Sequence, residues 1–90
     1  MYIIEFTNKA EKDLGKLPKQ TIARILDKID KLVDDPRPSG HKKLNDFHVP
    51  NAPDDFYRIR IGDYRVIYAI EEEIITITVV KVAHRKEVYK

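Results

Sequence analysis

The chain has 90 residues, no cysteine and no tryptophan, and its 17 basic residues against 15 acidic ones give a formal net charge of +2. This length fits a single domain spanning residues 1–90, and the lack of cysteine excludes a disulfide framework and favours a reducing compartment, so we expect a cytoplasmic protein. No apolar run approaches the roughly 20 residues of a membrane span, and no signal peptide is expected. Because so small a core gives marginal stability, an economical fold or a stabilising partner is expected.

The first third of the chain predicts a strand and two helices. Residues 1–6, MYIIEF, form a short strand, and Asn8, three residues before Glu11, predicts a capping box for a helix that begins near Lys9. Pro18 ends that helix and suits the first turn of the next one. The apolar residues of the second helix follow the i, i+3, i+4, i+7 spacing: Ile22, Ile25, Leu26, Ile29, Leu32 and Val33.

The strongest local pattern is a β-hairpin. In 57–61, apolar residues alternate with arginines, and in 64–70 Tyr64, Val66, Tyr68 and Ile70 resume the same period of two. Gly62-Asp63 between them is a typical two-residue hairpin loop. With that loop, Arg60 lies directly opposite Arg65. The apolar pairs then share the other face: Ile61 with Tyr64, Ile59 with Val66, and Tyr57 with Tyr68.

Around the hairpin, residues 34–40 predict a loop, and 41–55 are irregular apart from a short extended piece near Lys43-Leu44. The β-branched run 74–82 predicts a final strand that is central or covered on both sides. The order of elements predicts an α+β fold, in which an N-terminal strand and a helical hairpin precede a three- to four-stranded antiparallel sheet packed on the helices. The face of the hairpin that carries the arginines then points away from the helices.

Three arginines on that face need an explanation. Directly opposed like charges destabilise a sheet by up to about 1 kcal/mol, so folding alone does not favour Arg60 across from Arg65. An anion bound between the guanidinium groups removes the conflict. Together with Arg58, the two residues predict an anion-binding surface.

The motifs KKL (42–44), YRIRIGDYRVIY (57–68) and VAHRKEVY (82–89), in this order after a two-helix half, resemble the RelE/ParE superfamily of toxins from toxin–antitoxin pairs. The resemblance spans essentially the whole chain and is greater to the RelE branch. It implies a ribosome-dependent endoribonuclease that cleaves mRNA and inhibits translation, with a RelB-like antitoxin as its partner in a toxin–antitoxin complex. It implies no cofactor.

The resemblance also assigns roles to residues. Arg58 and Arg60 match a pair of basic residues that are lysines in the RelE pattern, and because arginine keeps its proton they bind phosphate rather than act as a base. Arg65 matches the arginine after the turn. Two further matches lie in the last motif: Arg85, an electrostatic group or a proton donor, and Tyr89, near the C-terminus.

The acid–base group stays open between two residues. Histidine ordinarily changes its protonation state near neutral pH, which favours His84, and Tyr89 is the alternative if nearby guanidinium groups lower its pKa. Lys42 and Lys43 are expected to contact RNA phosphates. A metal site is not expected, since His41 and His48 lie in irregular sequence without cysteine or spaced carboxylates.

Two other functions remain possible from the sequence. A toxin of the ParE kind inhibits DNA gyrase without RNA cleavage, and its arginines would form a protein-binding surface. A toxin fold that has lost activity would serve as a binding module or as part of a repressor complex.

Overall fold

The structure is a computed structural model that describes residues 1–45 and 55–87. These residues form a strand, two helices and four further strands. The elements are β1 Ile3–Phe6, α1 Asn8–Gly15, α2 Lys19–Lys31, β2 Lys42–Leu44, β3 Phe56–Ile61, β4 Tyr64–Glu71 and β5 Thr76–His84. Within the described residues, no helix has the length and apolarity needed to cross a lipid bilayer.

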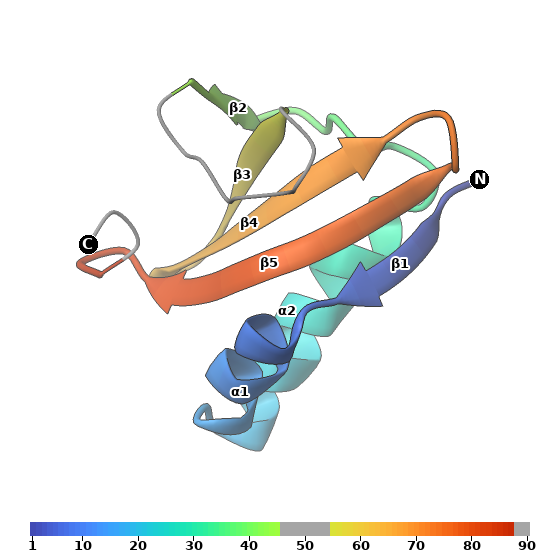
Figure 1. Ribbon diagram of the computed structural model, residues 1–90. Coiled ribbons are helices and arrows are strands. Elements are labelled where there is room, and N and C mark those ends of the chain that lie inside the picture. The colour runs from blue at the N-terminus through green and yellow to red at the C-terminus, as the bar shows by residue number, and fades with distance from the viewer. Residues whose placement is uncertain (46–54, 88–90) are drawn as a thin grey trace.

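One twisted sheet lies against the two helices, which cover one of its faces (Figure 1). The α+β class and the helical hairpin are as predicted, but the sheet has five strands, in the order β1-β5-β4-β3-β2, and is mixed. The additional pairing is that of β1, which runs parallel to β5 with Ile3 beside Thr76 and Phe6 beside Val79. Pairing along the edge of β5 lets β1 pack Ile4 and Phe6 against the core under the helices.

The main core lies between the helices and the sheet. Ile25 and Ile29 of α2 and Leu32 at its C-cap are buried at the predicted helical spacing, and on α1 Ala10 and Leu14 are buried one turn apart. From the sheet they meet the four hairpin residues that were predicted to face them: Tyr57, Ile59, Val66 and Tyr68. Each fully buried aliphatic side chain contributes about 1.5–3 kcal/mol. On the opposite face of the sheet, the described residues form a smaller apolar cluster, in which Phe56, Ile67 and Ala69 are buried.

The hairpin has the predicted register. Arg60 pairs with Arg65, and the three apolar pairs are as expected. Gly62 adopts a φ of +58°, which a glycine tolerates without steric strain, so the two-residue loop closes the hairpin. The last strand is central, as predicted, although it begins at Thr76 rather than Ile74 and extends to His84.

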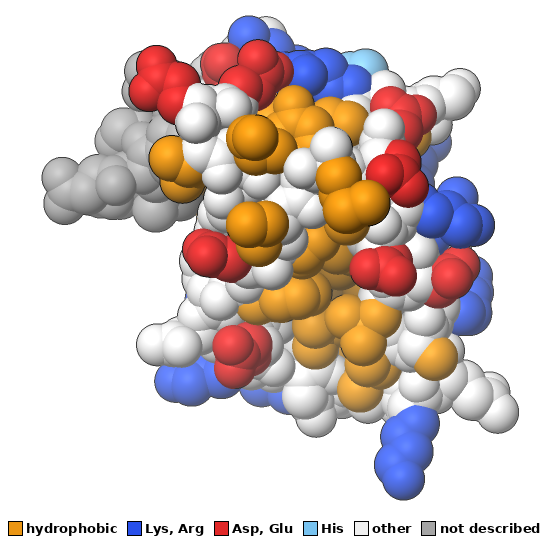
Figure 2. All heavy atoms as spheres, turned by 90° about the vertical axis from the view of Figure 1, so that its right-hand side faces the viewer, with side chains coloured by type: hydrophobic (Ala, Val, Ile, Leu, Met, Phe, Trp, Pro, Cys, Tyr) orange, Lys and Arg blue, Asp and Glu red, His pale blue; other side chains and the backbone are white. Residues whose placement is uncertain are grey.

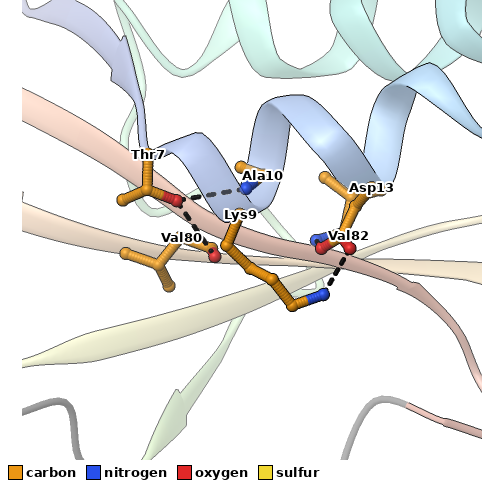
Figure 3. A network of polar contacts seen from close by, with 6 residues as sticks. All are labelled: Thr7, Lys9, Ala10, Asp13, Val80 and Val82. Atoms are coloured by element: carbon orange, nitrogen blue, oxygen red, sulfur yellow. Dashed lines mark hydrogen bonds and ion pairs between the residues drawn. The ribbon is translucent and has the colours of Figure 1, made fainter.

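A polar network joins α1 to the edge of β5 (Figure 3). The N-cap of α1 is Thr7 rather than Asn8: its hydroxyl accepts from the Ala10 N–H at 3.1 Å and donates to the Val80 carbonyl at 3.3 Å. Asp13, only 8% exposed, accepts from the Val82 N–H at 3.0 Å and pairs with Lys9. Because β1 pairs with β5 only as far as Val79, these two side chains satisfy the backbone groups that β1 does not reach.

Loop 34–40 is fastened to the core by two tyrosines. The Tyr68 hydroxyl donates to the Pro36 carbonyl at 2.7 Å, and its burial raises its pKa, so it stays a proton donor. Arg37 lies 5.1 Å from the centre of the Tyr57 ring and pairs with Glu72 at 2.7 Å. The loop therefore holds a fixed position beside β3.

Ile75, in the turn before β5, has a φ of +50°, a conformation that β-branched residues rarely adopt. Replacing Ile75 by asparagine, which tolerates this region, should raise the free energy of unfolding by about 1 kcal/mol, measured by urea denaturation. The matched control is Ile74→Asn, since Ile74 is also exposed but lacks the positive φ. A gain of the same size at both positions would show that exposed apolar surface, not backbone strain, is responsible.

Candidate functional site: an arginine face on the sheet

The face of the sheet that points away from the helices carries the three hairpin arginines, and we call it the arginine face. Arg60 is exposed and lies directly opposite Arg65, which is half-buried. Arg58 lies two residues before Arg60 on β3 and has Ile67 as its neighbour on β4. Since alternate residues of a strand share one face, the three predicted anion-binding side chains belong to one surface.

Arg58 is the most unusual of the three. It is only 7% exposed, and among the described residues no hydrogen-bond acceptor meets its Nε. Its β2 neighbour is Lys42, so two cations lie side by side. A buried polar atom without a partner costs about 1–3 kcal/mol, so this arginine is poorly explained by folding.

We expect Arg58→Met to raise the free energy of unfolding by about 1 kcal/mol, because methionine fills a similar volume without a buried charge or an unsatisfied N–H. Chemical denaturation measures this. The matched control is Arg37→Met, which removes an arginine that has both an ion pair and an aromatic contact and should lower stability. If Arg58→Met destabilised the protein as much as the control, Arg58 would be a structural residue.

The Arg65 guanidinium is held in place by its own hairpin turn. Its Nη1 donates to the Gly62 carbonyl at 3.0 Å and to the Tyr64 carbonyl at 2.9 Å. A side chain fixed in this way meets an anion without losing further rotamer freedom. Arg60, across from it, is exposed. The pair therefore combines one preorganised and one accessible guanidinium.

Arg85 joins this end of the sheet through the hairpin turn. Its backbone N–H donates to the Asp63 carbonyl at 2.7 Å, and its Nε lies 3.9 Å from Asp63 Oδ1. Both side chains are more than half exposed, so the ion pair holds Arg85 only weakly. Arg85 lies beside the turn that connects the strands of Arg60 and Arg65.

His84 lies on the opposite face of the sheet. It pairs with Tyr64, which packs against the main core, and their ring centres are 5.7 Å apart. The cause is a β-bulge: Ile67 pairs with Lys81 but Tyr68 pairs with Val79, so β5 has one extra residue there. If β5 alternated regularly from Val79 onward, with no bulge, His84 would lie on the arginine face.

One nitrogen of the His84 ring takes part in a hydrogen bond. Its Nδ1 lies 3.2 Å from the Lys86 N–H and accepts from it, which leaves Nε2 to carry the proton of the neutral ring. At the end of β5, His84 precedes Arg85 directly. Tyr89, the alternative acid–base group, lies outside the described residues, as does His48.

The two lysines of β2 differ in position. Lys42 is opposite Arg58 and so belongs to the arginine face, whereas Lys43 is opposite Tyr57 and pairs with Asp55 at 3.3 Å. The structure therefore brings Lys42, but not Lys43, next to the three arginines.

Further basic residues lie close to the arginines although the sequence reading did not select them. Lys28 and Lys31 of α2 line a groove of about 480 Å³ that Arg58 and Arg60 also line. Their spacing of three residues places them on one side of the helix. That spacing predicts a contribution to the site only once the helix is known to lie beside β3. Within the described residues, no three histidine, aspartate or glutamate side chains gather to hold a metal ion. The carboxylate of Asp35 also lines the groove, and the groups that can bind an anion there are guanidinium and ammonium groups.

Comparisons with known proteins agree with the fold and motifs. Residues 4–89 match the family described as "ParE toxin of type II toxin-antitoxin system, parDE". Toxin RelG of Mycobacterium tuberculosis is 28% identical over 90 residues, which cover 99% of this chain and 97% of that protein.

Two solved structures are similar over nearly their whole length. The archaeal RelE–RelB complex from Pyrococcus horikoshii superposes with a TM-score of 0.78 at 31% identity, covering 97% of this chain and 98% of that one. The toxin–antitoxin complex RelBE2 from Mycobacterium tuberculosis gives a TM-score of 0.73 at 30% identity, covering 93% and 98%. The chain therefore belongs to the RelE/ParE family of toxins from type II toxin–antitoxin systems.

Proposed function

We propose that the protein is the toxin of a toxin–antitoxin pair and acts as a ribosome-dependent, metal-independent endoribonuclease on mRNA. The observation that carries the proposal is the cross-strand pair of Arg60 and Arg65 beside a buried Arg58. Such an arrangement is unfavourable for folding and favourable for holding a phosphodiester. The similarity to toxins named RelG and RelE supports the choice of RNA as substrate.

The reaction that suits this site uses the nucleophile of the RNA itself. The ribose 2′-oxygen attacks the adjacent phosphorus, a new O–P bond forms, and the bond from phosphorus to the 5′-oxygen breaks. A base takes the proton of the 2′-hydroxyl and an acid gives one to the departing 5′-oxygen, which leaves a 2′,3′-cyclic phosphate and a 5′-hydroxyl. Arg60 and Arg65 would stabilise the charge that builds on the phosphoryl oxygens, and their fixed positive charge suits that role.

The acid and base are assigned to the end of β5. His84 would exchange a proton through Nε2, with Tyr89 as the alternative, and Arg85 would add positive charge from beside the turn. His84 lies on the helix-covered face, so an RNA strand would have to pass around the end of the sheet to meet both groups. Cleavage retained in His84→Gln and lost in Tyr89→Phe would assign the chemistry to the tyrosine.

Partners follow from the same proposal. The similar structures of RelE–RelB and RelBE2 are toxin–antitoxin complexes, which supports a RelB-like antitoxin for this chain. The ribosome would hold the mRNA in a geometry ready for attack, which matters for a site poor in ordinary acid–base groups. Free RNA should then be cut poorly, and the protein would act in the cytoplasm.

A map of new RNA 5′-ends after brief induction without antitoxin tests the proposal. One reporter transcript keeps its start codon and a second lacks it. We expect codon-phased ends in the translated transcript only. Equal cleavage of both transcripts would contradict ribosome dependence, and the absence of new ends during growth arrest would contradict cleavage itself.

A second candidate is a toxin of the ParE kind that inhibits DNA gyrase. The description of the matching family favours it, and so does the separation of His84 from the arginines by the sheet. Inhibition of supercoiling by purified gyrase, without RNA cleavage, would select this function. A harmless protein that still binds an antitoxin would instead be an inactive binding module.

A further inference from the structure

The groove of about 480 Å³ that Lys28 and Lys31 line runs between α2 and the edge of β3, and we call it the α2–β3 groove. Arg58 and Arg60 line it from the arginine face, whereas Ile59 lines it from the helix-covered face. The groove therefore passes around the edge of β3. This edge is open because β2 pairs with β3 only as far as Arg58, and no other described strand covers the edge beyond that residue.

The groove concentrates positive charge. Two lysines and two arginines line it, and Asp35 is the one acidic residue among the described residues that do so. Four positive charges against one negative charge exceed the formal net charge of the whole chain, which is +2. An anion is the ligand that such a groove would favour.

The side of α2 that faces β1 has a different character. Leu26, Asp27 and Asp30 line a separate groove there, and Leu26 is 40% exposed although its spacing predicts burial. Figure 2 shows hydrophobic side chains running down the middle of the β1 side of the molecule, with acidic side chains beside them and basic side chains toward the margins. The cations of the α2–β3 groove thus form a local cluster and are not part of an evenly basic surface.

Arg58 is independent evidence that the groove has a ligand. Its side chain is only 7% exposed, and its Nε has no hydrogen-bond acceptor among the described residues. A buried donor without an acceptor lowers stability, so the chain gains nothing from it in folding. A phosphate oxygen in the groove would supply the missing acceptor through a charge-assisted hydrogen bond.

The groove is formed before a ligand binds. Residues 38–40 line its loop side, and this loop is held by the hydrogen bond from the Tyr68 hydroxyl to the Pro36 carbonyl at 2.7 Å. On the helix side, the ion pair of Lys31 with Asp27 is long, at 3.5 Å, and both side chains are 70% exposed. Such a pair is weak, so Lys31 can turn to an anion at little cost.

We propose that the α2–β3 groove binds the phosphate next to the scissile one in the same mRNA strand, with Lys28, Lys31 and Arg58 as its ligands. Arg60 connects the two positions, because it lines the groove and also lies opposite Arg65. A strand whose scissile phosphate lies between Arg60 and Arg65 would continue over the edge of β3 into the groove. The proposal rests on the proposed function for the identity of the RNA, but binding in the groove requires no cleavage.

The test measures binding of the free toxin to a short single-stranded RNA whose 2′-hydroxyls are methylated, so that it cannot be cut. We expect the double change Lys28→Gln with Lys31→Gln to weaken binding roughly tenfold at low salt, and to reduce the slope of log K against log salt by about 0.7 for each lost phosphate contact. Fluorescence anisotropy at several salt concentrations measures both. The matched control is Lys12→Gln with Lys19→Gln, which removes the same charge from exposed helix positions outside the groove and should bind nearly normally.

Replacing one phosphate of this RNA at a time by neutral methylphosphonate shows whether the contact is direct. At one position, the replacement should weaken binding by the wild type but not by the Lys28 and Lys31 variant. An equal loss of affinity in the control variant, or normal RNA binding by the groove variant, would overturn the proposal. Normal binding of this RNA combined with weaker binding to ribosomes would also overturn it, because the groove would then contact ribosomal RNA.

The same measurements separate this proposal from the proposed function. A wild type that cleaves no mRNA on ribosomes, together with a groove variant that loses affinity for the methylated RNA, would contradict the proposed function and leave the phosphate site in place. Cleavage by the wild type with unchanged RNA affinity in the groove variant would do the reverse.

Discussion

Replacing Arg60 by glutamine should lower the rate of RNA cleavage roughly 100-fold, because the variant loses a positive charge beside the preorganised Arg65 guanidinium, where the transition state becomes more negative. The same change should raise the free energy of unfolding by up to about 1 kcal/mol, since it removes a like-charge pair from the hairpin. Rates on ribosome-bound mRNA and urea denaturation measure the two effects. A loss of activity combined with a gain of stability identifies a residue kept for function.

Arg24→Gln is the matched control for this variant. Arg24 is also exposed, lies on α2 and has its guanidinium beside Gly62, close to the same turn. We expect it to cleave RNA at nearly the wild-type rate. If Arg24→Gln and Arg60→Gln lost activity equally, the effect would come from the overall positive charge, and the cross-strand pair would have no special role.

Replacing Asp13 by alanine should lower the free energy of unfolding by about 2 kcal/mol, because it leaves the Val82 N–H buried without an acceptor. For a domain of this size, that loss corresponds to a fall in melting temperature of about 10 °C. The bond to Val82 follows directly after the bulge of β5, so the change should also loosen the strand end that carries His84. Thermal unfolding and hydrogen exchange of β5 measure the two effects.

Asp13→Asn separates the hydrogen bond from the charge. Asparagine keeps an oxygen that can accept from Val82 but loses the ion pair with Lys9, whose side chain is 62% exposed and contributes little. We expect this variant to keep most of the stability. Equal destabilisation by alanine and asparagine would mean that the carboxylate charge, not the acceptor, stabilises the contact between α1 and β5.

The parts of the fold that short-range patterns determine were predictable. The period of two around Gly62-Asp63 determined the hairpin, its register and the position of Arg60 across from Arg65. The spacing of Ile25, Ile29 and Leu32 determined the buried side of α2. In each case, the residues that form the pattern are close in sequence, so the local periodicity is enough to predict the feature.

Other features depend on contacts between distant residues. The parallel pairing of β1 with β5 joins residues more than seventy positions apart, and no local pattern specifies it. The single extra residue of the β5 bulge changes the face of His84, and no glycine in the strand signals it. From the sequence, Asp13 is an ordinary charged helix residue. Its role as the acceptor for the Val82 N–H depends on β5 lying beside α1.

The most direct test of the account is cleavage of mRNA on purified ribosomes, with the chemistry of the new ends determined. We predict 2′,3′-cyclic phosphate and 5′-hydroxyl ends from the wild type, and almost none from Arg60→Gln. Undiminished cleavage by the Arg60 variant, or no cleavage by the wild type together with inhibition of gyrase, would contradict the assignment of the arginine face to RNA cleavage.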